Sequence, residues 1–263
     1  MRWRQGEVQT PDGPLAYHRT GGPGPVLVLA HGLGDYGLCW TRVASTLEAD
    51  FDVVMFDARG HGRSARMQGE RSPSPADDVC SVILATASSA VLLMGHSVGA
   101  RAAAECASLH PELVQKLILV DPPLLALPDP ATLNARRKMF HNYILSLQTM
   151  SDAELHEEWR RHHPHWHECE FQHWATSKRM ADPGAIPNYS GPWQRSITAL
   201  QMPTLLIYGD AANGSLVRND TAREAETLSH KIQLRYISEA GHSVHREAFD
   251  AFVTAVRAFL SNQ

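Results

Sequence analysis

Short apolar runs alternate with longer segments of helical spacing through most of the chain. The apolar runs are four or five residues long: 26–30, 53–56, 90–93, 116–120 and 204–208, with a more polar one at 231–237. Continuous apolar runs of this length are typical of strands buried on both faces of a parallel sheet. Between and after them, helical patterns occupy 40–47, 76–87, 100–107, 194–200, 215–228 and the last segment through Leu260. The alternation predicts an α/β fold with a mostly parallel, doubly wound sheet.

Two regions depart from this alternation. At the start, Glu7–Thr10 and Leu15–Arg19 flank Pro11-Asp12-Gly13-Pro14, which predicts an N-terminal β-hairpin. In the middle, residues 124–192 are helix-patterned and rich in His, Trp, Arg and Pro. We therefore predict a core formed by 1–123 and 193–263, with 124–192 inserted as a helical cap, or lid, over the carboxyl ends of the strands.

Composition and charge narrow the class of protein. The 263 residues are 43% hydrophobic, enough for a sizeable core, and a net charge of -4 argues against nucleic acid or an anionic membrane as the partner. No apolar stretch is long enough to span a membrane, and no secretory signal opens the chain, so we expect a cytoplasmic protein. The four cysteines lack paired spacing, which predicts reduced thiols. The oligomeric state is not indicated.

The stretch Gly95-His96-Ser97-Val98-Gly99 is the strongest chemical signal. It directly follows a predicted strand and directly precedes a predicted helix. A serine on so sharp a strand-to-helix turn exposes its hydroxyl above the sheet, and glycines two residues away on either side avoid a clash. The N-terminus of the following helix favours negative charge near the serine. Ser97 is therefore the candidate nucleophile.

Two further turns supply candidate partners for Ser97. His31-Gly32-Leu33-Gly34 follows the first buried strand, so Leu33 and Val98 are the candidate backbone donors of an oxyanion hole. His242 follows Gly241 after the last strand and is the candidate general base; His245 lies on the next helix and is disfavoured. In the loop 57–64, we expect Asp57 and Arg59 to brace the turn. The histidines of 156–173 lack the spacing of a helical zinc site, and we expect neither metal nor cofactor.

These motifs and their order resemble the α/β-hydrolase superfamily with a helical cap, over essentially the whole chain. The commoner superfamily position for the acid of the triad holds Ala212 or Asn213, which cannot stabilise an imidazolium. Two carboxylates remain: Asp121, at the end of the strand after the elbow helix, and Asp210, directly after Gly209. Several superfamily members place the acid where Asp121 stands, so Asp121 is favoured and Asp210 is the alternative.

Residues 91–101 and 117–123, together with the Trp-containing cap, resemble a deformylase branch of the superfamily that cleaves amides. This resemblance implies that the acyl group is formyl, that the leaving group is the enamide nitrogen of a small diacid, and that the pocket contains cations. The candidates for those cations are Arg101, Arg160, Arg161, His162, His163 and His165.

The sequence thus predicts a serine hydrolase acting through Ser97, His242 and Asp121 on the amide bond of a small, anionic substrate. The alternatives are a carboxylesterase or lactonase on small esters, and a ligand-binding regulator of slow turnover on the same fold. The basic, histidine-rich cap favours the amide hydrolase over an esterase with an apolar pocket.

Overall fold

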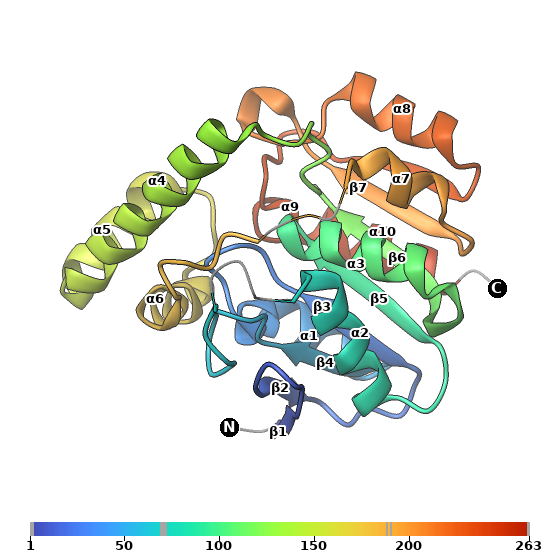
Figure 1. The fold of residues 1–263 in the computed structure, drawn as a ribbon, viewed down its shortest axis with the longest axis horizontal. Helices are drawn as coiled ribbons and strands as arrows, with labels where there is room; N and C mark the ends of the chain where they lie inside the picture. The colour runs from blue at the N-terminus through green and yellow to red at the C-terminus, as the bar shows by residue number, and fades with distance from the viewer. Residues whose placement is uncertain (1–2, 69–72, 188, 190, 262–263) are drawn as a thin grey trace.

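The predicted strands lie in one largely parallel sheet. The computed structural model describes residues 3–68, 73–187, 189 and 191–261, and within them eight strands follow the order β1-β2-β4-β3-β5-β6-β7-β8 (Figure 1). The six strands β3 to β8 all run parallel to one another. The strands β1 and β2 form the predicted hairpin, and β2 pairs antiparallel with β4 at one edge of the sheet. The strands are β1 (Arg4–Val8), β2 (Leu15–Arg19), β3 (Val26–Ala30), β4 (Asp52–Phe56), β5 (Val91–His96), β6 (Val114–Val120), β7 (Thr204–Tyr208) and β8 (Ile232–Tyr236). The predicted fold class is confirmed.

Helices cover both faces of the sheet. One face packs on α2 (Pro75–Thr86), α3 (Val98–Leu109), α7 (Trp193–Thr198) and α8 (Asn219–Leu228); the other packs on α1 (Thr41–Leu47) and α10 (Phe249–Ser261). Successive strand residues alternate between the two layers: Leu93 joins the first, and Leu92 and Met94 join the second. Both faces are buried, which explains why the strands read as unbroken apolar runs. Short helices link these elements: η1 (Gly37–Trp40), η3 (Pro111–Leu113), η5 (Ala211–Asn213) and α9 (Val244–Glu247).

A third group of helices has a core of its own. These are α4 (Pro130–Thr149), α5 (Asp152–His162), η4 (Glu168–Glu170) and α6 (Phe171–Met180). They enclose a small apolar cluster of leucines and tryptophans: Leu147, Leu155, Trp159, Trp166 and Trp174. Figure 1 shows α4, α5 and α6 together at one side of the molecule, apart from the helices that cover the sheet. Among the described residues, none of the helices combines the length and apolar character needed to cross a membrane.

Two sequence-based expectations are wrong. The helix expected from Ser215 begins only at Asn219, because residues 215–217 are bound in a loop described below. The expectation of four reduced thiols also fails: Cys80 on α2 and Cys106 on α3 form a disulfide with their Cα atoms 6.0 Å apart. These cysteines are 26 residues apart, and only the packing of α2 beside α3 brings them together. Cys39 and Cys169 are free.

The loop after β4 is braced by buried charges, as predicted. Asp57 accepts hydrogen bonds from the N–H groups of Gly37 and Arg63. The Arg59 guanidinium forms an ion pair with Asp78 of α2 at 2.8 Å and also donates to the backbone oxygen of Asp12. The side chains of Arg59 and Asp78 are only 3% and 6% exposed, so the pair ties the hairpin, the loop and α2 together inside the protein.

We predict that Asp78→Ala lowers the free energy of unfolding by about 3–5 kcal/mol, because it leaves the Arg59 charge buried without its partner. The control is Asp50→Ala, which removes the carboxylate of the exposed Arg257–Asp50 pair and should cost about 0–1 kcal/mol. Urea denaturation of the two variants measures the difference. Equal losses would show that the buried pair does not brace this region.

Candidate active site

The turn that carries Ser97 is strained and closely packed. Ser97 has φ 53° and ψ −123°, a backbone conformation that residues with side chains rarely adopt. A Cβ at Gly95 would lie 2.6 Å from the backbone nitrogen of Ala100, and one at Gly99 would lie 2.4 Å from the His31 carbonyl oxygen. Both positions therefore require glycine, and the turn directs Ser97 into a cavity at the carboxyl ends of the strands.

The structure brings Ser97, His242 and Asp121 together in one chain of hydrogen bonds. The Ser97 Oγ lies 3.0 Å from the Nε2 of His242, and the Nδ1 of His242 lies 2.6 Å from the Oδ2 of Asp121. The His242 side chain is 33% exposed, whereas that of Asp121 is fully buried. The imidazole thus connects a hydroxyl at the cavity wall with a carboxylate inside the protein.

Asp121 is held by donors from two loops. It has φ 42°, and its carboxylate accepts hydrogen bonds from the Ser215 Oγ and from the N–H groups of Leu216 and Val217, in addition to the bond with His242. These donors belong to the loop after β7, at the place where the sequence suggested a helix.

Asp210, the alternative acid, lies elsewhere. It directly precedes η5. Its N–H donates to the Ala240 carbonyl oxygen, and its carboxylate interacts with the Tyr236 hydroxyl. The structure therefore joins Asp121, and not Asp210, to His242.

Two candidate oxyanion donors face the same cavity. Leu33 and Val98 both line it beside Ser97, and a Cβ at Gly32 would lie 3.4 Å from the Ser97 Cβ, so the two turns are in close contact. The Ser97 N–H donates to the Val120 carbonyl oxygen and the Asp35 N–H to that of Gly32. Within the described residues, the N–H groups of Leu33 and Val98 have no such acceptor, so both can donate to a ligand.

Two buried histidines hold the turn that contains Leu33. The Gly34 N–H donates to the Nε2 of His61, and the His31 Nδ1 donates to the Gly32 carbonyl oxygen. The Nε2 of His31 in turn accepts from the Ala58 N–H. A nitrogen that accepts a hydrogen bond cannot carry a proton, so both rings must be neutral. Burial lowers the pKa of His31, and burial together with the neighbouring His31 lowers that of His61 to about 3.

His96, inside the serine motif, contacts the loop that carries the base. Its Nε2 donates to the backbone oxygen of His242 over 3.0 Å, and its ring lies 4.7 Å from that of His242. His245, the histidine that the sequence disfavoured, is buried against His96 and Trp40. Burial lowers the pKa of both His96 and His245 well below the usual range, so neither is charged at neutral pH.

The cavity above Ser97 has a volume of about 610 Å³, within the range of small-molecule sites. Leucines from α4 and from the segment before it contribute to its wall: Leu125, Leu127 and Leu133. Charged and aromatic side chains form another part: Asp35, Arg136, His163, Trp166, Trp174, Lys178 and Arg246. The cavity wall therefore combines apolar and cationic side chains.

The buried carboxylate of Asp35 joins the turn after β3 to α6 and α9. It lies 2.9 Å from Arg246 of α9 and 3.5 Å from the Nζ of Lys178 of α6, which also donates to the Gly34 carbonyl oxygen. Burial alone would raise the pKa of Asp35, but Arg246 and Lys178 hold it well below its usual range. Glu170 lies 3.5 Å from Arg246, but burial raises its pKa. Asp35 is therefore the firmly ionised partner of two cations.

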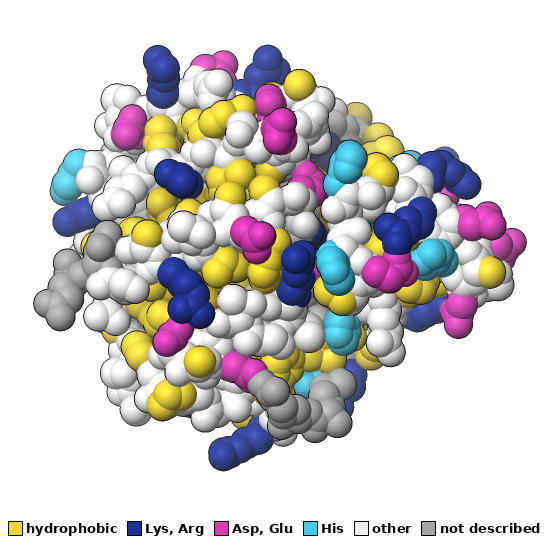
Figure 2. Space-filling view, turned by 180° about the vertical axis from the view of Figure 1, so that it is seen from behind, with side chains coloured by type: hydrophobic (Ala, Val, Ile, Leu, Met, Phe, Trp, Pro, Cys, Tyr) yellow, Lys and Arg dark blue, Asp and Glu magenta, His cyan; other side chains and the backbone are white. Residues whose placement is uncertain are grey.

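The cations that the sequence suggested for the pocket mostly lie outside it. Arg160 pairs with Glu168, while Arg161 and His162 pair with Glu158. His165 lines a different surface hollow, and the Arg101 guanidinium donates to the Gly191 carbonyl oxygen. Figure 2 shows histidine, basic and acidic side chains side by side over the cap.

Of the six candidates, only His163 lines the cavity, where burial with Arg246 and Lys178 lowers its pKa to about 3. It is therefore not a cation at neutral pH. Sequence reasoning missed the cavity's actual cations, Arg136, Lys178 and Arg246. In the part of the chain that the structure describes, no three His, Cys, Asp or Glu side chains come together in a way that would hold a metal ion.

Comparison with known proteins gives consistent matches. A model of the "Alpha/beta hydrolase family" matches residues 27–255. N-formylmaleamate deformylase of Pseudomonas putida is 27% identical over 94% of this chain and 92% of its own length. An esterase of Mycobacterium tuberculosis is 26% identical over 95% of this chain and 88% of its own.

Solved structures share the fold at lower identity. The crystal structure of E-2-(acetamidomethylene)succinate hydrolase has a TM-score of 0.78 at 18% identity, covering 99% of this chain and all of that one. A thioesterase domain from the curacin biosynthetic pathway also has a TM-score of 0.78, at 24% identity, covering 97% of this chain and 99% of that domain.

Because His61 is neutral in the folded protein, the free energy of unfolding should depend on pH. An unfolded chain protonates this histidine near pH 6.5, whereas the folded protein resists protonation down to about pH 3. The unfolded state therefore binds more protons in this window, and stability falls as the pH drops below 6.5. We predict that in His61→Gln the free energy of unfolding depends less steeply on pH between 4 and 6, by about 1.4 kcal/mol per pH unit.

Urea unfolding at a series of pH values measures this slope. The exposed His230→Gln serves as the control and should keep the wild-type slope. If both variants retain it, His61 is not held neutral by the fold.

Proposed function

Since this chain belongs to the alpha/beta hydrolase family, we propose that it is a serine hydrolase whose catalytic triad is Ser97, His242 and Asp121. The observation that carries the proposal is the unbroken hydrogen-bond chain from the Ser97 hydroxyl through His242 to the buried Asp121 carboxylate. That chain ends at the wall of a cavity large enough for a small molecule.

The reaction follows from the roles of these groups. Ser97 Oγ attacks the substrate carbonyl carbon while His242 Nε2 takes up the hydroxyl proton. The N–H groups of Leu33 and Val98 donate to the oxyanion, and Asp121 stabilises the imidazolium. His242 then gives its proton to the leaving group, and an acyl-enzyme remains on Ser97. Water, activated by the same imidazole, attacks this ester and releases the acid, which restores the serine.

The charges around the cavity support a substrate that carries a carboxylate. Arg136 is an exposed cation at the cavity wall, and the wall also contains Lys178 and Arg246, which are paired with Asp35 and, for Arg246, with Glu170. Burial, and after it the field of Arg246 and Lys178, lowers the pKa of His163, so this ring adds no positive charge to the wall. A substrate carboxylate in the cavity would gain an attractive partner in Arg136.

We favour cleavage of an amide C–N bond, in line with the deformylase relative. A second candidate, hydrolysis of a small ester, is supported by the esterase relative and by the leucine-lined part of the cavity, which suits an apolar alcohol. In both, residues 124–192 act as a lid that supplies the upper wall of the cavity. Both proposals use the same triad and require no cofactor.

We predict that Asp121→Asn lowers kcat by about 10⁴-fold, because an amide cannot hold the His242 tautomer that accepts the serine proton; a loss of this size is known from a serine protease. Asp210→Asn should leave kcat unchanged, because Asp210 does not contact His242. Steady-state kinetics on small formamides and p-nitrophenyl esters measure both variants.

The Ser97→Ala variant is the control for nucleophilic chemistry. It should be folded and inactive, and a serine-directed sulfonyl fluoride should label the wild type only. Strong activity in Asp121→Asn combined with a large loss in Asp210→Asn would transfer the acid role to Asp210.

We predict that half-esters of a dicarboxylic acid are hydrolysed with higher kcat/KM than the matching neutral diesters, and that the preference shrinks as salt screens the cavity cations. Arg136→Met should lower kcat/KM for the half-ester about two- to fivefold, through KM, and leave the diester unchanged. Lys138→Met, on the same exposed helix but away from this cavity, is the matched control. A preference for the neutral diester at all salt concentrations would favour a neutral-ester hydrolase instead.

A further inference from the structure

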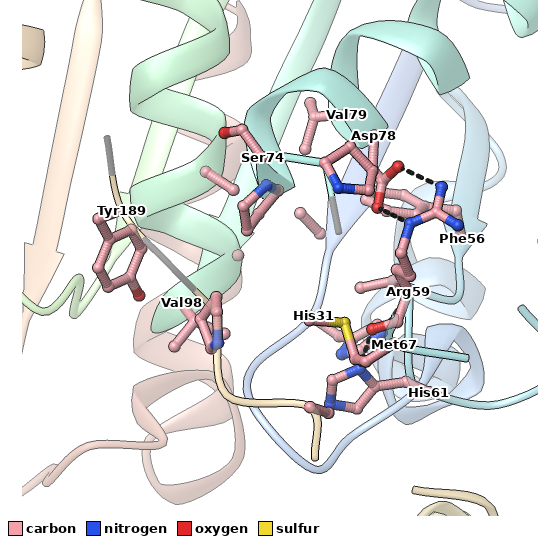
Figure 3. A pocket seen from close by; sticks show the side chains of 18 residues that line it. His31, Phe56, Arg59, His61, Met67, Ser74, Asp78, Val79, Val98 and Tyr189 are labelled. Atoms are coloured by element: carbon pink, nitrogen blue, oxygen red, sulfur yellow. Dashed lines mark hydrogen bonds and ion pairs between the residues drawn. The ribbon is translucent and has the colours of Figure 1, made fainter. Parts of the chain in front are cut away.

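A second chamber lies behind the Ser97 turn. It has a volume of about 240 Å³ and lies between the loop after β4, the first turns of α2 and α3, and the residues Ala185, Pro187 and Tyr189. Figure 3 shows Val98 and Tyr189 along one side of this chamber and the Arg59–Asp78 ion pair along the other. The proposed reaction at Ser97, His242 and Asp121 does not use this second chamber.

The chamber adjoins the catalytic cavity without coinciding with it. The two share the lining residues Val98, Pro187 and Tyr189. Ser97, His242 and the cations Lys178 and Arg246 line only the larger cavity, whereas Phe56, Met67 and Ala102 line only the smaller. A ligand in the chamber would therefore contact Val98 without contacting Ser97 or His242.

Apart from Tyr189, the charged and polar side chains in the chamber wall already have partners. Arg59 is paired with Asp78, and both ring nitrogens of His31 and of His61 are used in hydrogen bonds to the backbone. The Ser74 hydroxyl accepts from the Ala76 N–H at the start of α2. Because the histidines are neutral and the ion pair balances itself, the wall carries no net charge. A charged ligand would lose its hydration there without gaining a partner.

One polar atom in the wall lacks a partner. Among the described residues that line the chamber, only Tyr189 has a buried side-chain oxygen with no hydrogen bond. Burial raises the pKa of this phenol above its usual range, so it stays protonated. An unpaired buried hydroxyl is costly, and a ligand that supplies one hydrogen-bonding atom would remove that cost.

We propose that this chamber binds a small, uncharged, apolar ring that carries one hydrogen-bonding atom directed at the Tyr189 hydroxyl. The volume agrees with that size, since an apolar protein cavity of about 150 Å³ accepts benzene. Such a ring would pack against Val98 and against the rings of His31 and His61, which hold the turn of the second oxyanion donor. It enters either as a free molecule or as the apolar arm of a substrate bound at Ser97.

The first experiment locates the site directly with 5-bromoindole. We expect crystals soaked in this compound to show an anomalous bromine peak in the chamber, and indole to bind the protein in solution. Ala185→Phe and Ala102→Leu add bulk to the chamber wall and should each weaken indole binding more than tenfold. Ala251→Phe, at an exposed site on α10, is the control and should bind as the wild type does. The thermal unfolding of each variant verifies that it is folded.

The second experiment tests the role of Tyr189. Tyr189→Phe should weaken indole binding about three- to tenfold, the effect of one lost hydrogen bond, and leave the binding of benzothiophene, which has a similar ring but no N–H, unchanged. Equal losses for both ligands would contradict the role assigned to the hydroxyl. A bromine peak only in the larger cavity, or indole binding that survives in both Ala185→Phe and Ala102→Leu, would overturn the proposal.

The two sources of the ring give different kinetics. If it is a substrate arm, Ala185→Phe lowers kcat/KM for indolyl-bearing esters but not for short esters. If it is a free molecule, Ala185→Phe affects both esters equally, while indole alters wild-type turnover of the short ester without competing with it. Binding is measured without turnover, so its failure is distinct from a failure of the proposed hydrolase reaction.

Discussion

The carboxylate of Asp121 fixes the arrangement on which the proposed chemistry depends. It stands at the end of β6, the strand beside the one that leads to Ser97, and it accepts hydrogen bonds from the loops after β7 and β8. A fully buried carboxylate is stable only when donors surround it, so the residues from 215 to 217 cannot continue the helix that follows them. The same requirement orients His242 toward Ser97.

A second buried carboxylate, Asp35, joins this arrangement to the cap. It lies two residues after Leu33 and forms ion pairs with Arg246, four residues after His242, and with Lys178 on α6. Lys178 also donates to the Gly34 carbonyl oxygen, so one cap side chain fixes the turn of a proposed oxyanion donor. Removing Asp35 would leave two buried cations without this carboxylate, and removing either cation would leave the buried Asp35 with one partner fewer; both changes are unfavourable. The cap position and the turn geometry are therefore energetically coupled.

The sequence revealed the parts of the fold that follow from local pattern. The strands 26–30 and 204–208 were predicted to the residue because both faces of each are buried. The pairing of Cys80 with Cys106 and the binding of residues 215–217 to Asp121 depend on contacts between distant segments, which no local pattern records. The basic cap segment was misleading for a similar reason, since its charges pair with neighbouring glutamates at the surface.

The location of the cavity charges constrains how specificity can change in this chain. Lys178 and Arg246 are bound to Asp35 and the Leu33 turn, so replacing either to accept a neutral substrate would also disturb the oxyanion donors. The cavity wall also contains residues that do not hold the Leu33 turn. Arg136, Leu125 and Leu127 are exposed and lie on α4 or in the segment before it. Substitutions there alter charge and apolar contact at the cavity wall while the buried ion pairs remain intact. We therefore expect substitutions at these exposed residues to change substrate preference more readily than substitutions at the buried cations Lys178 and Arg246.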